Sequence, residues 1–289
     1  MGILVARRVI PAARDRWLRW PPVAAMVRLD LLTALTSLTP YAAAAVVLAL
    51  AALLLQNDLH RIREDGLLVR GEPFALPLAT AGFLLALVLA TWAALAVARD
   101  REQGALELLC YGPVSPAAYL LARLVGLVLL ASLLLLVVLG GFALLSAATG
   151  LHLGLRAVLV LLLMAGPLAG AAGVGLAVAG AVRRARPAVL AVLGLALAGV
   201  GLQVAHEVLA RLPTPEFHAN PVQVVRWAAF LLSRVTGWAL PFGYVDRLMG
   251  AVLRGDAAQA LPAALAPWLY AAVLLALGTV ALEHTGVRR

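Results

Sequence analysis

The sequence predicts an all-α polytopic membrane protein with six transmembrane helices, built as a single transmembrane domain over residues 1–289. Of its 289 residues, 64% are hydrophobic and only 13% are charged, where a soluble domain carries about a quarter charged residues. The polar residues are confined to short islands between long apolar runs, so no water-soluble domain of useful size can be separated from them. These two observations place most of the chain in a lipid bilayer.

The N-terminal cytoplasmic segment, residues 1–37, is basic and contains a helix-forming stretch after Pro21 and Pro22. In residues 22–37, apolar side chains alternate with Arg28 and Asp30. This pattern is typical of an amphipathic helix that lies on a membrane surface, with nearby arginines among anionic lipid head groups. We expect such an interfacial helix here.

Six stretches are long and apolar enough to cross the bilayer, since a spanning helix needs about 20 mostly apolar residues. None of the six contains an acidic residue, an arginine or a histidine: 38–55, 76–98, 124–148, 157–182, 187–205 and 261–282. An external segment, 209–260, precedes the last span. Its apolar part, 220–253, is interrupted by Arg226, Pro241 and Asp246, so we interpret it as short interfacial or re-entrant helices, with a seventh span as the alternative.

The distribution of arginine predicts the orientation. With the N-terminus in the cytoplasm, the cytoplasmic segments hold 14 arginines against 6 acidic residues, and the opposite side holds 9 against 8. Cytoplasmic loops are enriched in basic residues, so both termini are expected in the cytoplasm. The predicted location is the cytoplasmic (inner) membrane of a prokaryote.

Several kinds of chemistry are excluded by what the sequence lacks. All 23 basic residues are arginine, so the chain has neither a Schiff-base lysine nor the lysine of a Walker A loop. Cys110 is the only cysteine, and the five histidines show no metal-ligand spacing. Because the spans carry no ionisable group, an ion-coupled carrier or channel is disfavoured. We expect no enzyme, no metal site and no nucleic-acid partner.

The densest cluster of charges lies between the second and third spans, in a loop covering residues 99–117. Leu106, Leu109 and Cys110 share one helical face, while Arg101, Glu102 and Glu107 can project to water or to a partner. One interpretation is a charged loop that only caps two helices. The other is a short surface helix through which a soluble partner acts on the membrane domain.

This loop resembles the coupling-helix signature of ABC transporter permeases of the ABC-2 type. The matching positions are Arg99, Arg101, Glu102, Gly104, Leu106, Glu107, Leu109, Pro113, Val114 and Ser115. Arg123 stands where the family usually has lysine, while Asp100, Ala105 and Pro116 depart mildly from the pattern. A second, weaker similarity covers residues 240–256 before the last span.

The resemblance implies a permease subunit that works with a separate ABC ATPase subunit and with a second permease subunit, identical or related. It implies no cofactor on this chain, with ATP and Mg bound by the ATPase. The expected ATPase interface comprises Arg99, Arg101, Glu102, Gly104, Leu106, Glu107, Leu109 and Pro113. Within it, Arg101, Glu102 and Glu107 are the expected polar contacts, and Leu106 and Leu109 the packed face.

The substrate is not specified by any motif, and no substrate-binding residue is assigned. The spans offer mainly small and aliphatic side chains, which suits a lipidic or amphipathic cargo carried outward. Gly166 and Gly170 form a G-x-x-x-G pair, which indicates close helix packing within the chain or across a dimer, and Pro167 is expected to kink that span. Trp227 and Trp238 are typical of anchors to membrane lipids, with docking of an extracytoplasmic partner as the alternative. The second candidate function is a non-transporting assembly or maturation factor, for example for an extracytoplasmic metalloenzyme.

Overall fold

The computed structural model describes residues 20–65, 72–111, 114–211 and 221–285, and within these ranges the chain is helical with no strand. The helices are α1 (Trp20–Thr36), α2 (Thr39–Asp65), α3 (Ala75–Glu102), α4 (Ala105–Tyr111), α5 (Pro116–Thr149), α6 (Leu155–Leu163), α7 (Ala165–Ala181), α8 (Ala185–Arg211), α9 (Pro221–Ala239), α10 (Phe242–Arg254) and α11 (Ala257–Thr285). The predicted all-α fold is confirmed.

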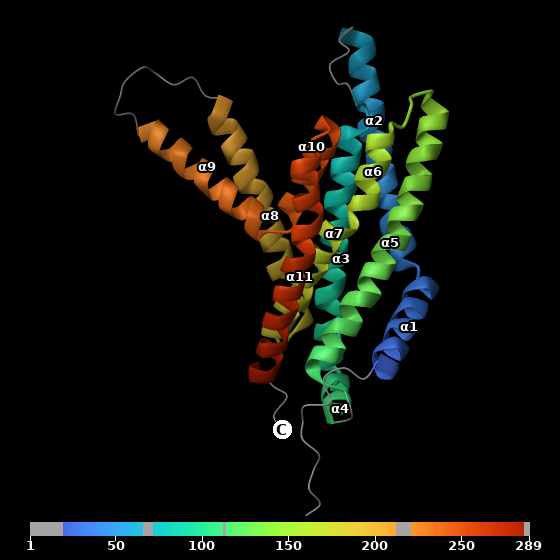
Figure 1. Ribbon diagram of the computed structural model, residues 1–289, viewed down its shortest axis with the longest axis vertical. Coiled ribbons are helices and arrows are strands. Elements are labelled where there is room, and N and C mark those ends of the chain that lie inside the picture. Colours follow the sequence, from blue (N-terminus) through green and yellow to red (C-terminus); the bar gives the residue numbers. More distant parts are fainter. Residues whose placement is uncertain (1–19, 66–71, 112–113, 212–220, 286–289) are drawn as a thin grey trace, which may run out of the picture.

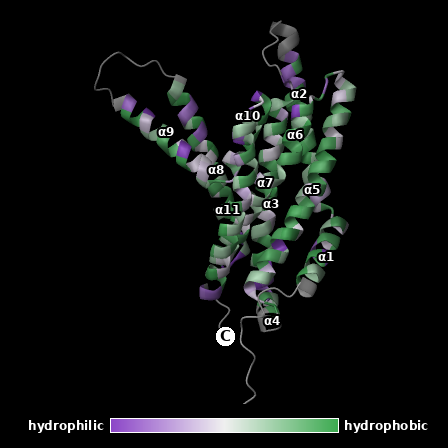
Figure 2. Cartoon of the chain, viewed as in Figure 1, coloured by the Kyte–Doolittle hydropathy of each residue, from purple (hydrophilic) through white to green (hydrophobic). Residues whose placement is uncertain are grey.

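Six helical segments in the described ranges are long and apolar enough to cross a membrane, which confirms the predicted number. They are Thr39–His60, Ala75–Glu102, Pro116–Thr149, Leu155–Ala181, Ala185–Ala210 and Ala257–His284. Figure 2 shows apolar residues along these long helices and hydrophilic residues gathered toward their ends. The long helices run roughly parallel (Figure 1), and α4 with the end of α11 lies at one end of the bundle and α9 toward the other. We call these the α4 end and the α9 end.

The fourth span is broken into α6 and α7 at Met164. Pro167 lies in the first turn of α7, where its ring would collide with the carbonyl of Leu163 if the helix continued unbroken. The predicted kink is therefore present, three residues before the proline.

The centre of the bundle is α7, which packs between α3 and α11. Its glycines allow this close approach: a β-carbon on Gly175 would overlap the carbonyl oxygen of Ala90 in α3, and one on Gly166 would overlap that of Ala264 in α11. A β-carbon on Gly170 would lie 3.2 Å from the Cβ of Pro267 in α11, which is a tight contact but not an overlap. The G-x-x-x-G pair therefore serves helix packing within the chain.

The α8–α9 arm diverges from the bundle (Figure 1), and α10 returns to pack against α11, α3 and α6. Only 17% of the most apolar stretch of α8 is buried, against 72% for the broken fourth span. Pro241 separates α9 from α10, and neither helix is among the candidate spans. This agrees with the interpretation of residues 220–253 as shorter helices.

The N-terminal helix α1 packs against the first half of α5. Val23 is 4% exposed and contacts Ala118 and Ala122 of α5. The Tyr41 hydroxyl of α2 donates to the Leu35 carbonyl at 2.9 Å, which braces the corner between α1 and α2. A helix is present at the expected place, over Trp20–Thr36, and its position on the membrane surface stays a prediction; residues 1–19 lie outside the described part of the chain.

Candidate functional site

The helix α4 lies at one end of the bundle, between the end of α3 and the start of α5 (Figure 1). The chain turns into α4 at Gly104, whose φ of +72° lies in the left-handed region that favours glycine. A side chain at this position would meet no neighbouring atom, so its backbone conformation is what requires glycine.

One side chain fixes α4 to the bundle. Leu106 is 1% exposed and belongs to the main hydrophobic core, and Leu109 packs partly buried against the same core. Leu108, in contrast, is 76% exposed. The packed face predicted from the sequence therefore contacts this chain's own bundle, and α4 presents Leu108 outward.

Arg101 and Glu102 join the end of α3 to neighbouring helix ends. Arg101 donates through Nη1 to the carbonyl of Gly180, in the last turn of α7, at 3.3 Å. Glu102 accepts a hydrogen bond from the backbone N–H of Ala185 at 2.8 Å, at the start of α8. Terminal carbonyls and N–H groups of helices lack partners inside the helix, so the two side chains satisfy one orphan group each.

The remaining predicted interface residues are only partly described. Arg99 is exposed near the end of α3. Glu107 lies on α4, with its side chain outside the described part, and Pro113 lies outside the described residues altogether. The structure thus brings Arg99, Arg101, Glu102 and Gly104 together at the junction of α3 and α4.

An ion-pair network beside this junction links three helices. The guanidinium of Arg123 in α5 donates to Asp30 in α1 at 2.5 Å and, through its other terminal nitrogen, to Asp100 in α3. The buried Tyr119 hydroxyl also donates to Asp100, at 2.5 Å. Burial raises the pKa of Asp30, and Arg123 acts against this shift. The network ties α1, α3 and α5 into one unit.

The sequence alone assigns no shared role to Asp30, Tyr119 and Arg123. It marks Arg123 by its place in the family pattern and Asp30 as a polar residue of an amphipathic helix. One signal points to Asp30, because acidic residues are rare beside long apolar runs and mark a partnered position. Nothing in the sequence, however, identifies Arg123 as that partner.

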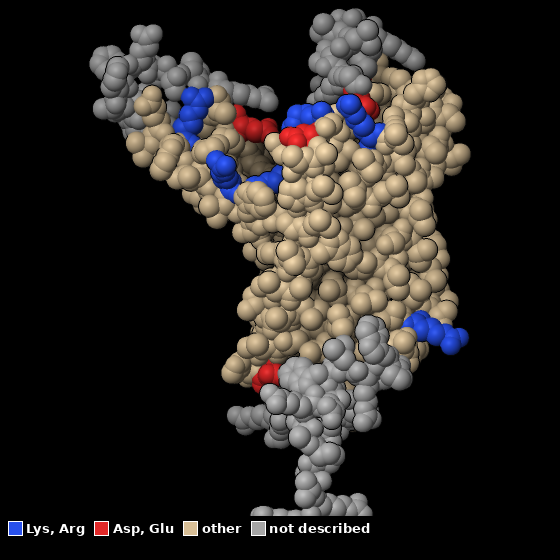
Figure 3. All heavy atoms as spheres, in the orientation of Figure 1, with Lys and Arg blue, Asp and Glu red and all other residues tan. Residues whose placement is uncertain are grey.

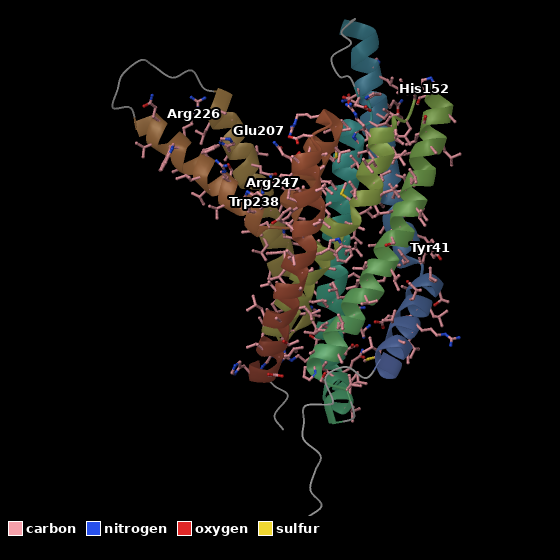
Figure 4. All side chains as sticks on the ribbon, in the orientation of Figure 1. Tyr41, His152, Glu207, Arg226, Trp238 and Arg247 are labelled. Carbon is pink, nitrogen blue, oxygen red and sulfur yellow. The ribbon has the colours of Figure 1, made fainter. Side chains whose placement is uncertain are left out.

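At the α9 end, charged side chains gather in the notch between the α8–α9 arm and α10 (Figure 3). Glu207, Trp238 and Arg247 lie there, Arg226 lies farther out on the arm, and His152 lies on the opposite side of the bundle near the end of α5 (Figure 4). The Arg247 guanidinium stacks over the Trp238 ring at 4.1 Å, and its Nη1 is buried without a hydrogen-bond partner in the described chain. Trp227 is 66% exposed, as expected of a lipid anchor.

A comparison with known protein families shows to which family this chain belongs. The model of the ABC-2 family transporter proteins matches residues 72–280, more than two thirds of the 289-residue chain. The chain belongs to the ABC-2 transporter family. The match includes α3 to α10 and nearly all of α11, and leaves out α1 and α2. No curated protein matches the chain.

Membership gives the site its context. An ABC-2 membrane domain is the permease component of an ABC transporter and is not itself catalytic, and such domains generally partner with an ABC ATPase. With six helices able to span a membrane, this ABC-2 chain is an integral membrane protein. No group of three or more potential metal-ligating side chains occurs among the described residues of this permease.

Proposed function

We propose that this chain is the permease subunit of an ATP-driven exporter, in which a separate ATPase acts on the α4 end and the substrate is lipidic or amphipathic. The α4 end is cytoplasmic in this proposal, as the positive-inside rule favours. The described arginines at that end are Arg28, Arg99, Arg101, Arg123, Arg183, Arg184 and Arg186. ATP and Mg bind to the ATPase, and a second permease subunit completes the transporter.

The observation that carries the proposal is the attachment of α4. It is anchored by Leu106 and follows α3 directly through Gly104, so a force on α4 acts on the end of a long spanning helix. Leu108, also on α4, is 76% exposed, which leaves an apolar side chain available to a partner.

The hydrogen bonds around α4 spread such a displacement to other helices. Asp100, two residues before the end of α3, is joined through Arg123 to α5 and α1. Arg101 and Glu102 join the same segment to α7 and α8. Five helices therefore share the displacement of one short segment, and ATP binding to the partner biases the membrane domain between two arrangements.

The test uses the charge of Glu102 and exploits its second role at the start of α8. Glu102→Arg reverses the charge, whereas Glu102→Gln removes it and keeps an oxygen that can accept the Ala185 N–H. The tagged full chain is purified from its native membranes, and the co-purifying ATPase is recognised by its Walker A motif. We expect Glu102→Arg to reduce the recovered ATPase severalfold and Glu102→Gln to have an intermediate effect.

The matched control is Glu72→Arg, a charge reversal just before the other end of α3. This variant is expected to retain the ATPase. Thermal unfolding of each purified variant separates loss of the partner from loss of the fold. Equal recovery of the ATPase with Glu102→Arg, Glu72→Arg and the wild type would contradict the proposed interface.

A further inference from the structure

A cavity opens between α1, the start of α2, α3 and α5, beside the Arg123 network. Its volume is about 630 Å³, within the range of about 300 to 1,000 Å³ typical of small-ligand sites. Along α3 its lining extends from Val88 to Gln103, which is about 22 Å of helix axis. The cavity is therefore elongated along the bundle and reaches from the α4 end toward the middle of the spans.

The two ends of this cavity differ in character. The charged lining residues lie at the α4 end: Arg99 and Asp100 where α3 finishes, Arg123 where α5 begins, and Asp30 of α1, which pairs with Arg123. Farther along, α3 contributes Trp92 and α5 contributes Leu130. An amphiphile with its head at the α4 end and its hydrocarbon chain toward the middle of the bundle matches this polarity.

The hydroxyl groups in the lining do not disturb this polarity. Thr33 donates to the Leu29 carbonyl at 2.8 Å within α1, and Ser37, just past the end of α1, donates to the Ala34 carbonyl at 3.0 Å. Thr91 donates in the same way to carbonyls of α3. Three of the four lining hydroxyl groups, all but that of Thr39, are therefore engaged with backbone carbonyls, and the charged groups are left as the main determinants of the ligand.

At the charged end, one guanidinium group and one carboxylate oxygen have no hydrogen-bond partner among the described residues. Arg99 has no ion pair or hydrogen bond through its side chain in the described part of the chain. Arg123 is shared by Asp30 and Asp100, so these three side chains together carry one excess negative charge. Arg123 bonds to one oxygen of Asp30, and the other, Oδ2, has no hydrogen-bond partner among the described residues.

We propose that this cavity binds an amphiphile with a zwitterionic headgroup of the phosphoethanolamine class, with its phosphate on Arg99 and its ammonium on Asp30. A purely anionic headgroup would face the excess negative charge of the Arg123 network, and a purely cationic one would face Arg99. This inference rests on the proposed function, because only a cytoplasmic α4 end places the cavity in the inner leaflet. It names the substrate class that the permease takes from that leaflet.

The experiment measures photolabelling of the full chain in maltoside micelles, without the ATPase. The probe is phosphatidylethanolamine with a diazirine in one acyl chain, and the comparison probe is the matching phosphatidylglycerol. We expect the first probe to label peptides of α3 and α5 that line the cavity. Arg99→Gln and Asp30→Asn should each reduce this labelling about tenfold, the effect of losing one charged contact.

The matched control is Arg28→Gln, which removes an exposed arginine of α1 that does not line the cavity. Its labelling is expected to equal that of the wild type. Thermal unfolding of Asp30→Asn distinguishes loss of the ligand from loss of the fold, and Arg99→Gln gives an independent answer because Arg99 bears no structural contact.

Three outcomes would overturn the proposal. Equal labelling by the phosphatidylglycerol probe would exclude selection of a zwitterion. If the Arg99→Gln and Arg28→Gln variants were labelled to the same extent, the assigned contact with Arg99 would be excluded. If water-soluble phosphoethanolamine reduced the photolabelling as strongly as unlabelled phosphatidylethanolamine does, the site would be one for the free headgroup and not for a lipid. Because no ATPase is present, these outcomes are independent of whether Glu102→Arg retains the ATPase.

Discussion

Arg123 and Asp30 lie 93 positions apart in the sequence, yet the guanidinium of the first donates to the carboxylate of the second at 2.5 Å. The contact fastens α1, which precedes the region matched by the ABC-2 family, to α5 inside it. Arg123 also binds Asp100, next to the segment that leads into α4. The N-terminal helix is thereby joined to the part of the bundle on which the ATPase is proposed to act.

Removal of the shared arginine tests this connection. Arg123→Gln leaves Asp30 and Asp100 as like charges without their common partner. We expect a loss of about 2 kcal/mol of stability, between the values typical of exposed and buried ion pairs. The thermal unfolding midpoint of the purified chain measures it. Adding Asp30→Asn and Asp100→Asn to Arg123→Gln should restore much of the loss, and no recovery in the triple variant would contradict the charge argument.

The pH dependence of stability tests the environment of Asp30. Burial holds its pKa above 3.8, so the folded chain binds this proton more tightly than the unfolded chain. The resulting contribution to stability is complete below pH 3.8 and is lost as the pH rises through the raised pKa. The stability of the wild type relative to Asp30→Asn should therefore fall as the pH rises above 3.8 and through the raised pKa. A relative gain with rising pH would mean that attraction to Arg123 outweighs burial.

The packing of α7 can be tested with a single methyl group. Gly175→Ala would place a β-carbon against the carbonyl of Ala90, so α3 and α7 must separate. We expect destabilisation of about 1 to 3 kcal/mol, as for other overpacked cores. Gly140→Ala in α5 is the control, since a β-carbon there meets no neighbouring atom. A Gly175→Ala chain that unfolds at the same temperature as Gly140→Ala would contradict the close contact.

The proposed orientation predicts from which side the exposed face of α4 reacts. Cys110 is the only cysteine of the chain, so Leu108→Cys in a Cys110→Ser background places a single thiol at the exposed position 108 of α4. In intact cells a membrane-impermeant maleimide should leave it unlabelled, and permeabilisation should allow labelling. In a Cys110→Ser background, Gln223→Cys on α9 should react in intact cells, because it lies toward the opposite end. The reverse pattern would place the α4 end outside.

Much of the fold follows from the sequence, because long apolar runs have few alternatives in a bilayer. The span predicted at 38–55 falls within α2 except for its first residue, the span predicted at 261–282 falls within α11, and the kink expected near Pro167 is the break at Met164. The order of elements along the chain also places α4 where the charged loop was expected. These features depend on composition and local sequence, which can be examined without knowing which helices are neighbours.

The contacts of the site could not be predicted in the same way. The acceptors of Arg101 and the donor to Glu102 are backbone groups of α7 and α8, about 80 positions away, and any helix end offers similar groups. The cavity beside Arg99 forms from four helices and leaves no periodic pattern in any one of them. Such features depend on which helices pack together, and the hydropathy pattern does not specify that.

Cross-linking from position 108, on the exposed face of α4, tests the central claim most directly. A photoreactive maleimide is attached to Leu108→Cys in a Cys110→Ser background in native membranes, and cross-linked peptides are identified by mass spectrometry with and without ATP. The account predicts a cross-link to a polypeptide with a Walker A motif, with a yield that changes when ATP binds. Cross-links confined to this chain and its lipids, unchanged by ATP, would contradict the proposal that a separate ATPase drives the permease through α4.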